Sequence, residues 1–324
     1  MIVVTGGAGF IGSNLVRGLN ALGREDVVVV DDLSDGRKFS NLVDCRFADY
    51  LDREIFRARI AAGSATLPDM EVIFHHGACV DTAEWNGRYM LDNNYSYSRE
   101  LLEFCTLSGT RLIYASSAAV YGVGVNFEEA SANERPVNVY GYSKKLFDDA
   151  ARGKMARLQS QVAGLRYFNV YGPGEWHKGR MASVALHLHT ELSATGVGRL
   201  FRGSGGYDDG EQRRDFIHVD DVVRVNLWLL QHPGVSGVFN VGTGMSRSFN
   251  DLAAILIAAH GTGRVEYVDM PADIESSYQS YPQAHLAALR AAGYQDSFRD
   301  LETGMRAYVL DLSRQRVMGR RPSR

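Results

Sequence analysis

The sequence predicts an α/β protein built on a doubly wound parallel sheet. Three observations lead to this prediction. Short apolar runs rich in β-branched residues alternate with longer amphipathic stretches, the apolar runs are continuous, and the first run leads directly into a glycine-rich turn. Continuous apolar strands suit a parallel sheet that helices cover on both faces. Alternation of strand and helix then builds a doubly wound fold.

The individual elements follow this alternation along the first half of the chain. We expect buried strands at 2–4, 27–30, 72–74, 112–114 and 162–166. We expect amphipathic helices at 11–22, 95–107 and 142–158. About six or seven parallel strands would then lie within the first 170 residues.

The pattern loosens after residue 171. Glycine becomes frequent at 196–210, and short strands mix with expected helices at 218–230, 249–259 and 298–312. We therefore predict a dinucleotide-binding domain at 1–170, to which the segment of about 214–242 returns. A smaller, mixed α/β C-terminal lobe for the substrate is predicted at 171–312. The basic segment 313–324 is expected to be a solvated tail.

Composition and charge exclude several classes of protein. The 324 residues carry 35 basic and 38 acidic side chains, a net charge of −3, which gives no electrostatic footprint for nucleic acid. Cys45, Cys79 and Cys105 show no metal-ligand spacing, so no metal site is predicted, and isolated thiols fit a reducing compartment. The sequence shows neither a signal peptide nor an apolar run of about 18 residues that could span a membrane. We expect a soluble, cytoplasmic protein.

A glycine-rich turn follows the first expected strand and precedes the first expected helix. Its glycines fit both the G-x-G-x-x-G pattern (7, 9, 12) and the G-x-x-G-x-x-G pattern (Gly6, Gly9, Gly12). Glycines at this spacing permit a tight turn, let backbone N–H groups approach a pyrophosphate and seat the helix close to the sheet. The strand–turn–helix context predicts a dinucleotide-binding Rossmann domain.

The residues after the second strand bear on the choice of cofactor. Asp31 and Asp32 stand about 20 residues beyond the last glycine, where a carboxylate accepts hydrogen bonds from the ribose of NAD. Arg37 and Lys38 follow closely and would suit the 2′-phosphate of NADP, although they could also be a solvated cationic loop. These residues alone leave NAD and NADP open. After the fourth strand, the small residues beside His76, namely Gly77, Ala78 and Cys79, would let the backbone approach the cofactor.

Three side chains predict redox chemistry on a hydroxyl group. Ser117 ends the fifth expected strand, and Tyr140 and Lys144 share one face of a helix because they are four residues apart. A lysine ammonium about 4 Å from the phenol would lower the pKa of the tyrosine by about three units before desolvation is counted. The phenolate could then take a hydroxyl proton while a hydride leaves the same carbon. Ser117 could hydrogen-bond that hydroxyl.

Together these segments resemble the extended short-chain dehydrogenase/reductase superfamily over essentially the whole chain. Within it, the sequence is most similar to the ADP-L-glycero-D-manno-heptose 6-epimerase family. The similarity is carried by residues 35–39, 41–44, 92–95, 138–144 and 166–173. The most diagnostic segment is 177–185, with the sequence HKGRMASVA.

The resemblance implies a two-base epimerase that holds NADP tightly. It implies transient oxidation at carbon 6 of an ADP-linked heptose, followed by hydride return to the opposite face, in the synthesis of lipopolysaccharide core precursors. Tyr140 and Lys178 would be the two bases, and Lys144 would support the tyrosine and the cofactor ribose. Without the resemblance, Lys178 would be interpreted as a surface cation. Members of the family assemble as homopentamers.

The resemblance also implies two sets of contacts. Counting the motif residues above, cofactor contacts are expected from Gly6, Gly9, Phe10, Ile11, Gly12, Asp31, Asp32, Lys38, Arg53, His76, Gly77, Ala78, Cys79, Asn93, Lys144, Val170 and Lys178. Contacts to the ADP-sugar substrate are expected from Ser117, Asn169, Arg180, His187, Phe201, Arg202, Gly203, Ser204, Arg214 and Tyr278. Arg213 and Arg214 would suit a diphosphate through bidentate hydrogen bonds.

Three departures and three alternatives accompany this interpretation. His76 stands where relatives often carry an acid, Arg180 replaces a smaller polar residue, and the 205–212 loop is longer than usual.

Another epimerase, such as a UDP-galactose 4-epimerase, would share the cofactor residues but would not require Lys178. A nucleotide-sugar 4,6-dehydratase would need an acidic pair at positions 118 and 119, which here are both alanine. A cofactor-sensing regulator without turnover would have little need of the Tyr–Lys pair.

Overall fold

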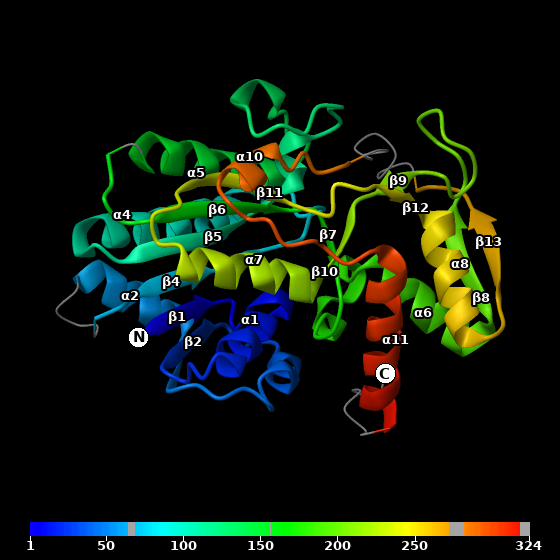
Figure 1. Ribbon diagram of the computed structural model, residues 1–324, viewed down its shortest axis with the longest axis horizontal. Helices are drawn as coiled ribbons and strands as arrows, with labels where there is room; N and C mark the ends of the chain where they lie inside the picture. Colours follow the sequence, from blue (N-terminus) through cyan, green and yellow to red (C-terminus); the bar gives the residue numbers. More distant parts are fainter. Residues whose placement is uncertain (64–68, 156, 272–281, 318–324) are drawn as a thin grey trace.

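The computed structural model of the protein describes residues 1–63, 69–155, 157–271 and 282–317. Figure 1 shows a larger part that contains the N-terminus and the main sheet, beside a smaller part that contains α6, α8, β8 and β13. The long C-terminal helix α11 (Leu301–Val317) runs alongside the smaller part.

The main sheet confirms the doubly wound α/β prediction. Its seven strands lie in the order β11-β6-β5-β4-β1-β2-β3, and every neighbouring pair is parallel. The strands are β1 (Ile2–Thr5), β2 (Val27–Asp31), β3 (Asp49–Asp52), β4 (Val72–His75), β5 (Arg111–Ser117), β6 (Val162–Tyr167) and β11 (Gly237–Val241). The strand order reverses between β1 and β4. In such sheets a ligand binds outside the carboxyl ends of the strands at this reversal.

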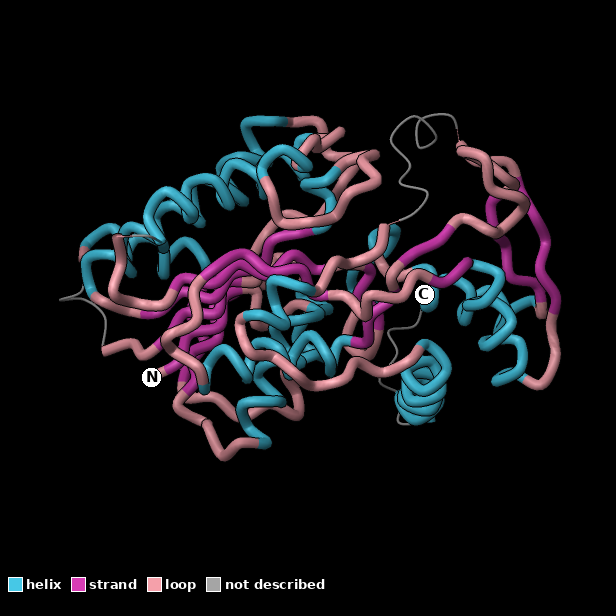
Figure 2. The backbone as a smooth tube through the Cα atoms, turned by 45° about the horizontal axis from the view of Figure 1, so that its top comes forward, coloured by secondary structure: helices cyan, strands magenta, loops and turns pink. Residues whose placement is uncertain are grey.

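Helices cover both faces of this sheet, and the strands are apolar on both sides for that reason (Figure 2). On one face, Ile2 and Val4 pack with side chains of α1 (Phe10–Ala21) and α7 (Val219–Gln231). On the other face, Val3 packs with side chains of α2 (Arg53–Ala62), α4 (Tyr97–Ser108) and α5 (Val139–Met155). A short helix α3 (Gly87–Leu91) and a π-helical turn η3 (Asp92–Ser96) lead into α4.

Some boundaries differ from those predicted. Six sheet strands lie within the first 170 residues, and the seventh, β11, comes from 237–241. The chain leaves the sheet after β6, because Asn169 N donates to Asp215 O and β7 (Asn169–Tyr171) pairs with β10 (Phe216–His218). The helix expected at 142–158 begins at 139 and ends at 155. The division into domains at residue 170 stays a prediction.

The smaller part has a core of its own. Its helices are α6 (Val184–Thr195) and α8 (Phe249–His260), and its strands are β8 (Val197–Phe201), β13 (Arg264–Val268), β9 (Arg213–Arg214) and β12 (Arg247–Ser248). Leu188, Leu192, Leu252 and Leu256 from the two helices pack with Tyr308 of α11. A further short helix, α10 (Ala287–Ala291), lies against β11. Among the described residues, no helix is long and apolar enough to cross a membrane.

Candidate active site

The glycine turn after β1 is shaped for close approach of another backbone. Gly6 has φ +65°, and a Cβ there would lie 2.6 Å from Gly77 N. A Cβ at Gly12 would lie 2.1 Å from Gly6 O. Gly9 is the N-cap of α1, so the first N–H groups of that helix are not covered by a capping side chain. This geometry fits the pyrophosphate of a dinucleotide.

A cleft of about 580 Å³ opens at the carboxyl ends of β1, β2, β4 and β5, where the strand order reverses. All of the predicted cofactor residues line it, together with Ser117 and Tyr140. Sequence reasoning missed other lining residues, which are Thr5, Val30, Asp35, Val80, Thr82, Tyr89, Tyr97, Ala115, Ser116, Tyr167, Phe168, His177 and Met181. Most of these flank predicted residues, so adjacency was the available signal. Which of these side chains point into the cleft could be determined only from the fold.

The two acidic residues after β2 are held in different ways. Asp31 is buried, and its carboxylate accepts hydrogen bonds from Ala8 N (2.8 Å) and from Lys38 Nζ (2.6 Å). The Asp32 carboxylate accepts a hydrogen bond from Ser34 N, and bonding to Ser34 is the main reason why its pKa is lowered. Asp31 is therefore fixed to the glycine turn and paired with a cation.

The two basic residues that follow have separate positions. Lys38 lines the cleft, whereas Arg37 does not line it and is paired with Asp35 at 2.7 Å. Of the two cations that would suit a 2′-phosphate, Lys38 therefore lies at the cleft, and Arg37 fits the alternative of a solvated cationic loop. The missed residue His177 lies in this region, with its Nδ1 atom 3.3 Å from Asn41 Nδ2. Burial and the charges of Lys38 and Lys178 lower the pKa of His177 to about 4.

The catalytic candidates on α5 and β5 come together in the cleft. Lys144 Nζ donates to Ala115 O at 2.9 Å, which fixes the lysine against the end of β5. Burial lowers the pKa of Lys144 to about 8, while the charge of Asp148 opposes that shift. Burial raises the pKa of Tyr140, and a hydrogen bond with Ser117 opposes it.

The structure therefore does not support the prediction that Lys144 lowers the pKa of Tyr140. Burial outweighs the other influences on the phenol, and the opposing influence comes from Ser117. The physical reason is that Tyr140 and Lys144 are both buried, and Lys144 Nζ is directed to the Ala115 carbonyl.

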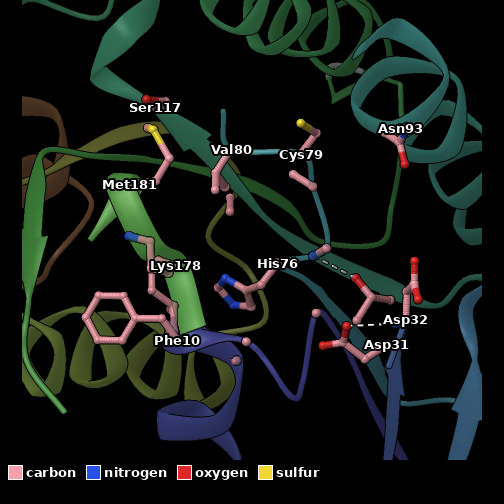
Figure 3. Close-up of a pocket in the computed structure, with 18 of the residues that line it drawn as sticks. Phe10, Asp31, Asp32, His76, Cys79, Val80, Asn93, Ser117, Lys178 and Met181 are labelled. Carbon is pink, nitrogen blue, oxygen red and sulfur yellow. Dashed lines mark hydrogen bonds between the residues drawn. The ribbon is translucent and has the colours of Figure 1, made fainter. Parts of the chain in front are cut away.

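Lys178 reaches the same cleft from another part of the chain. It belongs to the short 3-10 helix η6 (Trp176–Met181), and its Nζ atom lies 5.2 Å from the centre of the Phe10 ring. Figure 3 shows Lys178 between Phe10 and Met181, on the same side of the cleft as Ser117. Burial lowers the pKa of Lys178. Its position in the cleft differs from the surface position that the residues alone would suggest.

His76 is a half-buried, uncharged residue of the cleft. Its ring stacks on Tyr167, with ring centroids 6.0 Å apart and an interplanar angle of 9°. Burial, with a further contribution from the charge of Lys144, lowers its pKa to about 3. Where relatives often carry an acid, this chain therefore places an uncharged aromatic ring.

The predicted substrate residues are more scattered. Ser117 lines the cleft, but no other described member of the set does. Arg180 is exposed and paired with Asp81, and Arg214 is buried with its guanidinium 5.3 Å from the centre of the Phe249 ring. Asn169 and His187 are exposed, and Phe201, Arg202, Gly203 and Ser204 lie at and beyond the end of β8. Tyr278 lies outside the described residues.

Two further predictions concern anion and metal binding. Arg213 is engaged within the protein, since its Nη2 atom donates to Ser246 O at 2.6 Å. Arg213 is therefore hydrogen-bonded to Ser246, and the proposed contact of Arg213 and Arg214 with a diphosphate stays a prediction. The described residues contain no group of three or more His, Cys, Asp or Glu side chains that could hold a metal ion.

The fold and the cleft define an enzyme of the short-chain dehydrogenase/reductase type that uses a nicotinamide cofactor. The glycine turn, the Asp31 carboxylate and the Ser–Tyr–Lys group occupy one cavity. The model of the NAD dependent epimerase/dehydratase family matches residues 2–242, and the chain belongs to that family.

The similar proteins confirm the resemblance found in the sequence. An ADP-L-glycero-D-manno-heptose-6-epimerase of Alkalilimnicola ehrlichii is 55% identical over 309 residues, which cover 95% of this chain and 96% of that protein. The crystal structure of the Helicobacter pylori ADP-L-glycero-D-manno-heptose-6-epimerase has a TM-score of 0.83 at 31% identity and covers 96% of both chains. A UDP-N-acetylglucosamine 4-epimerase from Methanobrevibacter ruminantium has a TM-score of 0.82 at 25% identity, covering 97% of this chain and 98% of that one.

Proposed function

We propose that the chain is an ADP-L-glycero-D-manno-heptose 6-epimerase, which converts ADP-D-glycero-D-manno-heptose to its carbon-6 epimer for lipopolysaccharide core synthesis. The observation that carries the proposal is the entry of two proton-accepting side chains, Tyr140 and Lys178, into one cleft from different elements. The 55% identity to a protein of that name supports the choice of substrate.

The first base is Tyr140. Its phenol oxygen accepts the proton of the substrate hydroxyl, and Ser117 holds that hydroxyl in place. Lys144 stabilises the phenolate, and the hydrogen bond from its Nζ atom to Ala115 O fixes its position. A nicotinamide cofactor bound in the cleft would supply the hydride acceptor and donor for the sugar carbon.

The second base is Lys178. In the two epimers the hydroxyl lies on opposite sides of carbon 6, so a separate base for each epimer suits the reaction, and Lys178 would handle the hydroxyl proton on the side opposite Tyr140. Burial lowers the pKa of the Lys178 amine, which is the direction that makes a lysine better suited to give and take a proton. The aromatic face of Phe10 lies beneath the amine and keeps it in the cleft.

NADP is the cofactor that we propose. Lys38 lies 2.6 Å from Asp31, so the carboxylate that would otherwise accept both ribose hydroxyls of NAD is partly neutralised. A cation at this place suits the 2′-phosphate of NADP. Lys38, with His177 beside it, is the part of the cleft that would hold this phosphate.

The alternatives have weaker support. Relatives that act on UDP-sugars share the fold at about half the sequence identity, 25% against 55%. A dehydratase would need acidic side chains after Ser117, but the short 3-10 helix η4 (Ala118–Tyr121) begins with two alanines. A regulator without turnover would not need two proton-accepting side chains, Tyr140 and Lys178, in one cleft.

A substrate panel followed by proton NMR tests the proposal. The purified protein is incubated separately with ADP-glycero-manno-heptose, UDP-galactose and UDP-N-acetylglucosamine. We expect inversion at carbon 6 of the heptose and no change in either UDP-sugar. Turnover of a UDP-sugar with an inert heptose would overturn the substrate, and no turnover of any sugar would overturn the enzymatic proposal.

A further inference from the structure

A cluster of four charged side chains lies beside α5, β5 and β6, and three of them are buried. Arg166 Nη2 lies 2.5 Å from Glu134 Oε1 and 2.8 Å from Asp148 Oδ2, and all three side chains are completely buried. Arg152 Nη2 lies 2.7 Å from the same Glu134 oxygen. Two positive and two negative charges therefore balance within the cluster.

Asp148 joins the cluster to the wall of the cleft. Its carboxylate accepts hydrogen bonds from Tyr114 Oη (3.0 Å), Ser116 Oγ (2.9 Å) and Arg166 Nε (2.9 Å). Ser116 lines the cleft next to Ser117. One carboxylate on α5 therefore holds side chains from both β5 and β6.

The position of Asp148 on α5 relates it to the catalytic pair. Tyr140, Lys144 and Asp148 follow one another at four-residue spacing, so they lie along one face of the helix. Tyr140 and Lys144 line the cleft, while Asp148 does not. Buried ion pairs give little net stability compared with apolar packing, so stability alone is a weak reason for a charge at this place.

The groups around Lys144 leave Asp148 as its main negative neighbour. On α5 these groups are Tyr140 and Asp148, and beyond β4 the thiol of Cys79 faces the amine. His75 and His76 also lie close, but burial lowers the pKa of both rings and leaves them uncharged. Asp148 raises the pKa of Lys144 more than Cys79 does.

Ion pairs and hydrogen bonds around Asp148 favour its carboxylate form and oppose the effect of burial. Burial raises the pKa of this carboxyl, while Arg166, the Ser116 hydroxyl and the charge of Arg152 lower it. From β5, the Tyr114 phenol adds a third hydrogen bond.

We propose that Asp148 is a positioning residue that fixes α5 on β5 and β6 and holds the Lys144 amine in its ammonium form toward the cleft. Asp148 does not touch the reacting atoms and acts through Lys144. The inference rests on the proposed function, because one of its measurements follows epimerisation.

Three variants test the proposal. Asp148→Asn removes the charge but keeps one oxygen, which can still accept the hydrogen bond from Ser116 or the one from Tyr114. Asp148→Glu keeps the charge. Glu134→Gln is the matched control, because it removes the other carboxylate of Arg166, and Glu134 is not among the groups that shift the pKa of Lys144.

The first measurement is the pH profile of kcat with the heptose substrate. Losing a nearby negative charge weakens proton binding at Lys144, so the alkaline limb of Asp148→Asn should move to lower pH by about one unit. The limb of Asp148→Glu and of Glu134→Gln should stay at the wild-type position. An unmoved limb in Asp148→Asn, or an equal shift in Glu134→Gln, would overturn the proposal.

The second measurement does not depend on activity. Acetic anhydride modifies only the uncharged amine, so the acetylated fraction of Lys144 across pH, measured by mass spectrometry, reports its protonation. The midpoint should fall by about one pH unit in Asp148→Asn alone. If no sugar is turned over, this measurement still decides the proposal. If Asp148→Asn does not fold, Asp148→Glu decides. An unchanged midpoint of Lys144 acetylation in that variant would support the proposal, and a lowered midpoint would contradict it.

Discussion

At the residue scale, Tyr140 shows how burial and hydrogen bonding compete at one phenol. Burial disfavours the phenolate and raises the pKa, whereas the bond with Ser117 lowers it. The phenol is therefore protonated at neutral pH in the protein itself. Accepting a proton at this place requires the phenolate, and a positive charge that would favour it is not among the influences on the pKa of Tyr140 in the protein itself.

Replacing Tyr140 with Phe removes the proton acceptor and little else. Turnover of the heptose should fall by at least about a hundredfold, because general acid–base catalysis contributes on that order. Cofactor should remain bound, which the absorbance of the purified variant at the nicotinamide band would show. Val139→Ala, at the start of the same helix, serves as the control. Activity of Tyr140→Phe near that of the wild type would remove the tyrosine from the mechanism.

Lys38 is the second residue whose role can be isolated. Lys38→Ala should weaken NADP binding by about tenfold or more, since hydrogen bonds to charged groups contribute about 1.5–3 kcal/mol. NAD binding should hold or improve, because Asp31 would lose its cation and could accept the ribose hydroxyls. Titration of both cofactors measures the ratio. Arg37→Ala, whose side chain pairs with Asp35, should leave the ratio unchanged, and equal losses for both cofactors in Lys38→Ala would disprove the assignment.

At the element scale, the short helix η6 is held in place by one buried carboxylate. Glu175 is fully buried and accepts hydrogen bonds from Gly172 N, Ser183 N, Ser183 Oγ and Tyr308 Oη. It thereby ties the segment that carries Lys178 to the start of α6 and to α11. Backbone and side-chain donors converge on both carboxylate oxygens.

Glu175→Gln should destabilise the protein by about 1–3 kcal/mol, because an amide N–H₂ would face donors and leave buried groups unsatisfied. Thermal unfolding followed by circular dichroism measures the effect as a lower Tm. Glu54→Gln, which is largely exposed on α2, is the matched control and should change the free energy of unfolding by no more than about 0.5 kcal/mol. An unchanged Tm for Glu175→Gln would show that η6 does not depend on this carboxylate.

Comparison of the elements also shows which features of the protein can be predicted from the sequence and which cannot. The glycine turn, Asp31, and the Tyr140 and Lys144 pair lie within single short segments, where spacing and helical period determine which side chains share a face. The bond from Lys144 to Ala115 O and the cluster of Asp148, Arg166 and Glu134 join residues far apart in the chain. Pairings of that kind are set by the packing of α5 on the sheet.

At the scale of the whole molecule, the parallel sheet was predictable, and the segment of about 214–242 was expected to return to its domain, but the strand within that segment and its partner in the sheet were not predicted. Continuous apolar strands signalled a sheet covered on both faces, which the packing around Ile2 and Val3 confirms. β11 has the composition of an ordinary buried strand, and nothing local indicates that it pairs with β6. The predicted substrate residues have the same difficulty, because Arg180 and Arg214 find protein partners in Asp81 and Phe249.

At this scale the testable prediction concerns the oligomeric state of the protein. By its resemblance to the heptose epimerase family, the 35.8 kDa chain is expected to form a homopentamer in the cytoplasm. Sedimentation velocity at several concentrations should give a species of about five times the chain mass, since closed symmetric rings are the common form of such oligomers. A monomer or dimer across the whole concentration range would contradict the prediction.

The path of the chain between the two parts has a consequence for protein engineering. After β7 the chain builds α6 and β8, returns through β10, α7 and β11 to the main sheet, and then leaves again for α8, β13 and α11. Between β13 and α11 it returns once more, because α10 packs on β11. The smaller part is thus made of three separate stretches. A chimera that borrows substrate specificity from a relative cannot be made by one crossover, and all three stretches have to be exchanged around an untouched β11 and α10.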